Sequence, residues 1–543
     1  MKGNIRVNDP KTILLLLVSA FFTGFTLVCP KLGFIEWISI SPAAYFLLSN
    51  YEKIKKRQLF KYGFFFFFCF YVVSYHWFIY LYPLDFIDGM TPLSAWVVII
   101  AAAFGLSAFQ AIGGGVVFIV LGLLFKTGIA KKYGVLKPIL AASVWCVFEW
   151  CQTLFWFGVP WARLVLGQVE YTVSIQTVSL FGTYFITFLL VAVNFFLAYS
   201  FIHIERRKLC AALCAFLMMG NFALGSIVYF TDTDSDRRIS VAALQGNIPS
   251  NEKWDLSVFD KTEASYERQV NLAAASGAKM IVYPETAIPY TFSQNSSMSK
   301  YIKGISQNTG ATLLVGGFTN DPLGRGDYNS IVAFTPDGKM NDTVYSKRRP
   351  VPFGEYVPGK EIISALIPPL ASLVMSEEEI VAGEGANVIE LKEGKIGALV
   401  CFDSIYDSLA RDSVRDGAEL LTVSTNDSWF ADSAALYMHN AQAQLRAIEN
   451  GRYVVRAANT GISSIISDRG EVIASLEPNI EGYTIGEVQF NSHRTLYNII
   501  GNLFVYLCIS LCAFVFLTEI YFYFLKKALT KKENADKISI VEH

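Results

Sequence analysis

Eight long apolar segments dominate this chain and constrain its fold more than any other feature. A helix needs about 20 apolar residues to cross a hydrocarbon core about 30 Å thick. All the segments approach or exceed that length except the second, which is shorter. We therefore predict an α-helical membrane domain of eight spans. The segments cover residues 12–29, 34–48, 62–82, 93–125, 136–157, 173–203, 209–230 and 498–525.

The composition agrees with a membrane protein. Only 17% of the residues are charged and 53% are hydrophobic, whereas an ordinary soluble domain carries about 25% charged residues. This balance excludes a disordered chain and an ordinary cytosolic enzyme. It also excludes a nucleic-acid binder that works through basic patches, so we expect no nucleic-acid partner.

The loops between the apolar segments alternate between basic and non-basic along the whole chain. Because basic loops mark the cytoplasmic side of a membrane, we expect both termini in the cytoplasm and the block after the seventh span outside it. No small-residue cleavage site follows the first segment, so we expect an uncleaved anchor rather than a signal peptide. The basic clusters lie within residues 2–11, 53–61, 126–132, 206–208 and 526–532.

The block at 236–495 differs from the rest because short apolar runs alternate there with helical patterns. This alternation predicts an α/β domain between a seven-span membrane domain (1–235) and a last span with a cytoplasmic tail (496–543). We expect strands at 239–244, 280–283, 312–315, 331–335, 343–347, 396–400, 420–424, 453–457 and 462–467. We expect helices at 261–276, 297–307, 408–416 and 433–450.

Cys401 is the only one of the nine cysteines that lies in this middle block. A thiol without a disulfide partner is either buried filler or a nucleophile. The predicted strand 396–400 ends directly before Cys401, which favours the nucleophile, since a strand end can expose the sulfur beside backbone N–H donors. A thiol of ordinary pKa needs a base or a cation to attack at neutral pH.

Two charged residues can supply that base and that cation, because His439 and His493 form no recognisable pair with the cysteine. Glu285 ends a predicted buried strand, where we expect a raised pKa that suits a proton acceptor. Lys347 follows a predicted strand and can stabilise a thiolate or an oxyanion. Taken singly, each is more simply a surface charge, and spacing alone does not join the three residues. The domain has no metal-ligand cluster and no phosphate loop, so we expect no metal and no cofactor.

Cys401, Glu285 and Lys347 each lie in a longer sequence motif, and further motifs accompany them. The middle block resembles the nitrilase superfamily, and over nearly all of residues 1–525 the chain resembles the bacterial apolipoprotein N-acyltransferase family. The motifs are Gln245-Gly246-Asn247-Ile248-Pro249 with Lys253-Trp254, Pro284-Glu285-Thr286-Ala287, residues 347–356, Cys401-Phe402-Asp403, Asn426-Asp427-Ser428-Trp429-Phe430, and residues 446–449 and 458–463.

The resemblance implies an αββα sandwich with Cys401 as nucleophile, Glu285 as general base and Lys347 as oxyanion stabiliser. It implies that a fatty acyl chain moves from a phospholipid, typically phosphatidylethanolamine, through a Cys401 thioester to the N-terminal amine of diacylglyceryl-cysteine in an apolipoprotein. It also implies a bacterial inner membrane location with a periplasmic catalytic domain. The supporting or substrate-binding residues that it implies are Trp254, Glu355, Phe402, Asp403 and Trp429.

The chain departs from the family pattern beside the nucleophile. The family commonly has Tyr and then Glu after the cysteine, where this chain has Phe402 and Asp403. Phe402 lacks the hydroxyl, and Asp403 keeps the carboxylate with a shorter reach. The family often has Gly after the Trp-Phe pair, where Ala431 stands here. No departure touches the three catalytic candidates.

One apolar stretch and two other functions complete the expectations. Residues 362–375 are apolar but too short and proline-broken to span a membrane, and we expect a mobile arm that dips into the outer leaflet and gates the site; the alternative is a core segment. A membrane-tethered nitrilase-type amidase with water as acceptor needs the same triad, but a tether needs only one span. A transporter with a degenerate accessory domain conflicts with the scarcity of charges in the spans.

Overall fold

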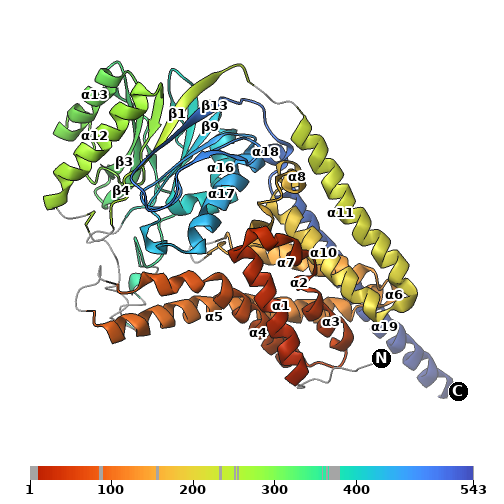
Figure 1. The fold of residues 1–543 in the computed structure, drawn as a ribbon. Helices are drawn as coiled ribbons and strands as arrows, with labels where there is room; N and C mark the ends of the chain where they lie inside the picture. The colour runs from red at the N-terminus through yellow and green to blue at the C-terminus, as the bar shows by residue number, and fades with distance from the viewer. Residues whose placement is uncertain are drawn as a thin grey trace.

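The computed structural model describes residues 10–84, 90–154, 158–231, 235–249, 252–253, 256–357, 359–361, 365 and 380–541. Figure 1 shows two parts, an α/β sandwich and a bundle of long helices beneath it. The main helices of the bundle are α1 (Pro10–Val28), α3 (Ser41–Asn50), α4 (Lys56–Ser74), α5 (Pro92–Phe125), α7 (Leu136–Cys151), α10 (Thr183–Ile202), α11 (Arg207–Phe230) and α19 (Leu503–Val541).

Six helical segments of the described chain are long and apolar enough to cross a membrane. They are Pro10–Val28, Pro30–Asn50, Pro92–Phe125, Thr183–Ile202, Ile204–Phe230 and Leu503–Thr530. The other two predicted spans correspond to α4, whose first turns carry Lys56, Arg57 and Lys61, and to α7, which has only 16 residues. Six of the eight predicted spans are therefore supported, and the count of eight stays a prediction.

The predicted span 173–203 is wrong at its start, because the chain breaks there. Two short helices, α8 (Thr172–Ile175) and α9 (Val178–Phe181), precede α10. Gly182 separates them from α10 with φ +80°, a left-handed conformation that glycine adopts without steric cost. The membrane-crossing part of this segment is α10 alone.

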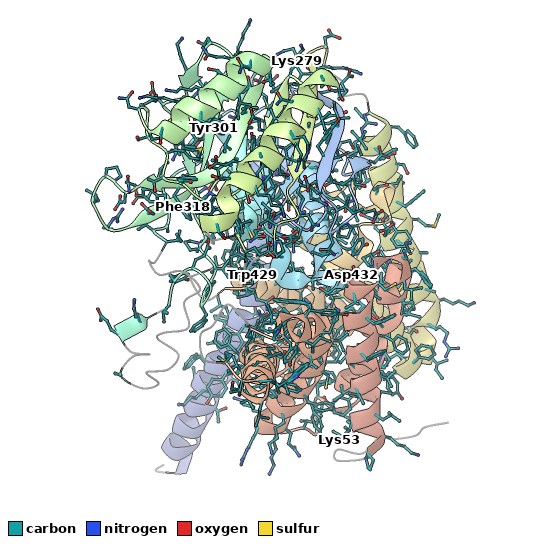
Figure 2. All side chains as sticks on the ribbon, turned by 60° about the vertical axis from the view of Figure 1, so that its left-hand side comes forward. Lys53, Lys279, Tyr301, Phe318, Trp429 and Asp432 are labelled. Carbon is teal, nitrogen blue, oxygen red and sulfur yellow. The ribbon has the colours of Figure 1, made fainter. Side chains whose placement is uncertain are left out.

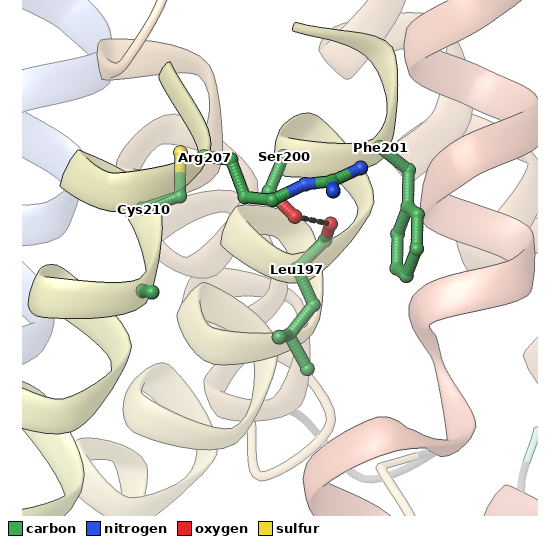
Figure 3. Close-up of a pocket in the computed structure, with 6 residues that line it drawn as sticks. Leu197, Ser200, Phe201, Arg207 and Cys210 are labelled. Atoms are coloured by element: carbon green, nitrogen blue, oxygen red, sulfur yellow. Dashed lines mark hydrogen bonds between the residues drawn. The ribbon is translucent and has the colours of Figure 1, made fainter. Parts of the chain in front are cut away.

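The helices pack closely where glycines replace larger side chains. A Cβ at Gly63 of α4 would lie 2.6 Å from the Gly114 carbonyl oxygen of α5, so the two backbones approach each other directly. A small pocket of about 370 Å³ lies between α10 and α11, lined by Leu197, Ser200 and Arg207 among others (Figure 3). It lies at the end of these helices away from the sandwich (Figure 1).

The sandwich consists of two stacked sheets. One has the order β13-β1-β2-β3-β4-β5 with β6 paired to β4, and the other has the order β12-β11-β10-β9-β8-β7. The strands of the first sheet are β1 (Arg238–Gln245), β2 (Met280–Val282), β3 (Thr312–Asn320), β4 (Asp327–Thr335), β5 (Lys339–Met340), β6 (Tyr345–Ser346) and β13 (Gly482–Gln489). Those of the second are β7 (Ile389–Glu390), β8 (Lys395–Val400), β9 (Leu420–Thr425), β10 (Val454–Ala458), β11 (Ser464–Ile466) and β12 (Val472–Ser475).

Helices cover the outer face of each sheet, which confirms the predicted α/β domain and its αββα layering. Between the sheets, Val282 and Leu314 of one share a buried core with Ala398 and Leu420 of the other. Helices α12 (Phe259–Ala275) and α13 (Ser297–Thr309) cover the first sheet. Helices α16 (Asp407–Arg415) and α17 (Ala434–Asn450) cover the second, and their apolar residues join one continuous core with those of the membrane helices.

Most predicted elements of the sandwich are present, with two kinds of difference. The strand expected at 343–347 is reduced to Tyr345–Ser346. Four strands were not predicted, and each depends on its partner: β5 and β7 have two residues each, β12 is largely exposed, and β13 pairs antiparallel along all of β1. Local apolar patterns do not report such pairings, because strand pairing is a tertiary interaction.

Candidate active site

Cys401 lies at the turn between β8 and the short helix η6 (Cys401–Ile405). Its φ is +49°, a left-handed conformation that costs a non-glycine residue about 1–3 kcal/mol. A strained strand-to-helix turn of this kind can present a nucleophile at the sheet edge, and we call it the nucleophile turn after the role predicted for Cys401. Burial and the charges of Glu285 and Asp427 raise the pKa of the Cys401 thiol, and the opposing effects of Lys347 and Thr425 do not offset them. The resting thiol is therefore neutral.

Glu285 and Lys347 meet beside this turn although 62 residues separate them. Glu285 follows β2, Lys347 follows β6, and Lys347 Nζ donates to Glu285 Oε1 at 2.8 Å. Lys347 Nζ also lies 2.8 Å from Glu355 Oε2. The lysine side chain is 1% exposed, so this cation is held between two carboxylates away from water.

The electrostatics of Glu285 differ from the sequence-based expectation of a raised pKa. Burial by itself raises the pKa of this carboxyl, but the charges of Lys347 and Lys253 and hydrogen bonds from Lys347 and Asn329 outweigh it, and the net effect lowers the pKa. The sequence-based expectation was wrong because it counted burial without the cations that folding brings. Glu285 is therefore an ionised acceptor in the resting site.

Asp403 and Phe402, which differ from the family pattern beside Cys401, each have defined contacts. The Asp403 carboxylate is fully buried and accepts hydrogen bonds from Tyr345 Oη (2.8 Å) and from the backbone N–H groups of Arg348 (3.3 Å), Arg349 (2.8 Å) and Val400 (3.2 Å). It thereby ties the segment after Lys347 to the nucleophile turn. Phe402 packs edge-on against Tyr406, with ring centroids 5.5 Å apart.

Trp429 is half-buried in the short helix η7 (Ser428–Phe430). Figure 2 places it with Asp432 at the edge of the sandwich that faces the helices, while Lys53 lies at the opposite end of the bundle. Trp254 lies outside the described residues, and so does the predicted arm at 362–375 except for Ala365.

Sequence reasoning missed three polar residues around the site. Asn329 donates to Glu285 Oε1 (2.8 Å) and Glu355 Oε1 (3.2 Å), and nothing in the pattern of its strand indicates this. Lys253 donates to the Glu285 carbonyl (2.8 Å) and to Thr286 Oγ1 (2.5 Å), and burial lowers its pKa to about 8. Lys253 did stand in a recognised motif. The third residue, His439, lies behind the nucleophile turn.

An apolar cavity of about 800 Å³ lies in the bundle among α5, α7 and α19. Its upper end is lined by Gly158 and Val159, and the Gly158 carbonyl accepts a hydrogen bond from Tyr406 Oη at 2.7 Å. Tyr406 in turn packs on Phe402, so one hydrogen bond and one ring contact connect the lining of this cavity to the residue after Cys401. No group of three or more His, Cys, Asp or Glu side chains that could hold a metal ion occurs in the described part of the chain.

These observations define a class: a nitrilase-type αββα sandwich, with a buried Glu–Lys pair beside a cysteine turn, carried on a bundle of apolar helices. The carbon–nitrogen hydrolase family matches residues 240–497, and the apolipoprotein N-acyltransferase N-terminal domain matches residues 15–196. The chain belongs to the apolipoprotein N-acyltransferase family.

Two bacterial relatives support that membership. The apolipoprotein N-acyltransferase of Geobacter metallireducens is 31% identical over 408 residues, 73% of this chain and 76% of the relative. That of Gloeobacter violaceus is 27% identical over 491 residues, 90% of this chain and 91% of the relative. Among solved structures, Saccharomyces cerevisiae Nit3, a member of branch 10 of the nitrilase superfamily, aligns with a TM-score of 0.37 and 20% identity over 48% of this chain and 92% of that chain.

Proposed function

We propose that this protein transfers a fatty acyl chain from a phospholipid to the N-terminal amine of diacylglyceryl-cysteine in apolipoproteins, through a thioester on Cys401. One observation carries the proposal: the strained cysteine turn and the buried Glu285–Lys347 pair lie together on a sandwich whose α17 layer packs on apolar membrane helices. A site for two acylated substrates needs such contact with the bilayer.

In the first step the Cys401 sulfur attacks the ester carbonyl carbon of the phospholipid while its proton passes to Glu285. Lys347 Nζ and the backbone N–H of Phe402 stabilise the oxyanion. When the tetrahedral intermediate collapses, the ester C–O bond breaks and the proton on Glu285 passes to the leaving lysophospholipid oxygen. Cys401 then carries the acyl chain as a thioester, and Glu285 is ionised again.

In the second step the neutral amine of the apolipoprotein attacks the thioester carbonyl. Glu285 accepts a proton from the amine nitrogen, the C–S bond breaks, and the proton then returns to the Cys401 sulfur. The product is an amide, and the site is restored. Glu355 and Asn329 hold the pair in place through both steps. Glu355 accepts a hydrogen bond from Lys347, and Asn329 donates to both Glu285 and Glu355. No cofactor takes part in this scheme.

The acyl chains reach the site from the membrane side. The 800 Å³ cavity among α5, α7 and α19 is almost wholly apolar, and Gly158 in its lining accepts a hydrogen bond from Tyr406 of the sandwich, which supports a lipid donor such as phosphatidylethanolamine. Trp429 lies at the edge of the sandwich toward the helices (Figure 2), and we assign it, with Trp254 and Phe402, to substrate contact.

We propose a bacterial inner membrane location with the sandwich on the periplasmic side and both termini in the cytoplasm. The basic Lys53 lies at the end of the bundle opposite the sandwich (Figure 2), and α19 runs away from the sandwich toward the C-terminus (Figure 1). Both agree with basic loops on the cytoplasmic side. We keep the three-part division at 1–235, 236–495 and 496–543 as a proposal.

The test compares the wild-type protein with Cys401→Ser on a diacylated lipopeptide and a phospholipid carrying a labelled acyl chain. We expect the wild type to form a hydroxylamine-sensitive acyl-enzyme and an N-acylated lipopeptide, and the variant to form neither. Labelled free fatty acid without N-acyl product would instead indicate the membrane-tethered amidase or hydrolase. Failure to trap acyl on Cys401 in the presence of phospholipid would refute the proposal.

A further inference from the structure

A chain of buried polar side chains lies directly behind the nucleophile turn. His439 Nδ1 is 2.8 Å from Asp427 Oδ1, and its Nε2 is 3.0 Å from Ser404 Oγ and 3.3 Å from the Cys401 carbonyl oxygen. Ser404 Oγ also donates to the same Cys401 carbonyl at 2.7 Å. His439 is 1% exposed, and Asp427 and Ser404 are fully buried. The mechanism above uses none of these three side chains.

The hydrogen positions in this group of side chains can be assigned from the atoms that can only accept a hydrogen bond. Arg456 Nη2 donates to Asp427 Oδ2 at 2.6 Å, and the charge of Arg456 is the largest effect that lowers the pKa of the Asp427 carboxyl against burial. Asp427 is therefore an ionised acceptor, and His439 Nδ1 carries a hydrogen. The Cys401 carbonyl accepts the Ser404 hydrogen, so the hydroxyl oxygen is left to accept from Nε2. All contacts are satisfied together only when both ring nitrogens carry hydrogens.

The charged groups that contact this hydrogen-bond network include the Asp427 carboxylate and two guanidinium groups. Asp427 is the only carboxylate contact of His439 among the described residues, and Arg456 Nη2 donates to the other oxygen of that carboxylate at 2.6 Å. Arg446, on the same helix as His439, donates to the Ser404 carbonyl at 3.3 Å. The rings of Trp161 and Phe430 lie 5.6 Å and 6.1 Å from the imidazole and keep it dry.

We propose that His439, charged and anchored by Asp427, is a positioning residue for the nucleophile. It clamps the Cys401 carbonyl directly and through Ser404, which holds the backbone of Cys401 at its left-handed φ. Its positive charge behind the turn also favours the thiolate that forms during attack. The inference rests on the proposed function in one respect, since it takes Cys401 as the nucleophile.

The test measures alkylation of Cys401 by iodoacetamide in the full-length protein in nanodiscs, by peptide mass spectrometry, from pH 6 to pH 10. His439→Gln keeps a donor near the Cys401 carbonyl without the charge, and His439→Ala removes both. At pH 8 we expect alkylation to be about tenfold slower in His439→Gln, because loss of a nearby cation raises the pKa of a thiol by about one unit. In His439→Ala we expect it about a hundredfold slower. His493→Gln, at an exposed histidine of the same domain, is the matched control and should stay within twofold of wild type.

The direction of the rate change separates this role from simple destabilisation. Because the pKa of the Cys401 thiol is raised, the rate rises with pH throughout this range, and we expect the His439→Gln curve to run about tenfold below that of the wild type. A purely structural change lowers the thermal midpoint and opens the buried cysteine to water and to the reagent, which speeds alkylation. Unchanged or faster alkylation in both His439 variants would overturn the inference. The assay needs no acyl transfer, so slower alkylation in a protein that makes no N-acyl product would leave the inference standing and refute only the proposed function.

Discussion

Replacing Lys347 with methionine removes a cation that contacts the carboxylates of both Glu285 and Glu355. Lys347 and Glu285 have side chains only 1% and 7% exposed, and removing one partner of a buried pair costs about 3–5 kcal/mol. For a domain of this size that loss lowers the thermal midpoint by about 10 °C. Loss of one oxyanion donor should also slow acyl-enzyme formation by about 10²–10³-fold.

The stability loss should depend on pH with a definite sign. In the wild type the pKa of Glu285 is lowered on folding, so its contribution is present above the unfolded pKa of about 4.3 and is lost as pH falls through the folded pKa. Without Lys347 burial dominates and the folded pKa rises, so the variant gains stability as pH falls toward the unfolded value. The difference between the two proteins should therefore shrink from pH 7.5 to pH 5.

The assay is thermal unfolding in detergent at both pH values, followed by tryptophan fluorescence, together with thioester trapping. The double variant Glu285→Gln/Lys347→Met is the control, because it also removes the more deeply buried of the two carboxylates that Lys347→Met leaves without their cation; the remaining one, Glu355, is 18% exposed. We expect it to recover about 2 kcal/mol of stability relative to Lys347→Met but no activity. The electrostatic reasoning fails if Lys347→Met loses the same stability at pH 5 as at pH 7.5, or if the double variant is no more stable than the single one.

Three further substitutions test the surroundings of the site. Asp403→Asn turns an amide N–H₂ toward at least one N–H or O–H donor whichever way it is oriented, so we expect a loss of about 2 kcal/mol in the free energy of unfolding, seen as a lower thermal midpoint, and slower thioester formation; an unchanged midpoint would contradict this. Gly316→Ala would drive its Cβ into the Pro284 carbonyl beside Glu285, and we expect acyl-enzyme formation to fall about 10²-fold, whereas Gly304→Ala, which meets nothing within 4 Å, should leave it unchanged. Arg163→Met removes the buried donor to Gln442 of α17 and should speed amide hydrogen exchange in that helix; unchanged exchange would show that this bond does not hold the two parts together.

Local pattern was sufficient wherever one segment determines its own structure. The apolar runs predicted six segments that form helices able to span a membrane, because length and hydrophobicity decide that property locally. Strands β1, β8 and β9 and helices α12, α13 and α17 lie where their periodicity predicted. Pattern failed at Gly182, where a backbone turn against the Tyr497 ring breaks an apolar run, since packing against a distant residue leaves no local trace.

The candidate site shows the same division. Residue types and motifs are visible without a structure, namely Cys401 after a strand, Glu285 and Lys347 in recognisable surroundings, and the family resemblance that joins them. Their contacts are visible only in the folded protein: Lys347 lies between Glu285 and Glu355, Asp403 ties two segments to the nucleophile turn, and His439 lies behind it. The lowered pKa of Glu285 is likewise a tertiary property. Charges interact through space over a few ångströms, and which charges come that close is fixed by the folding of strands and helices that lie far apart in the chain.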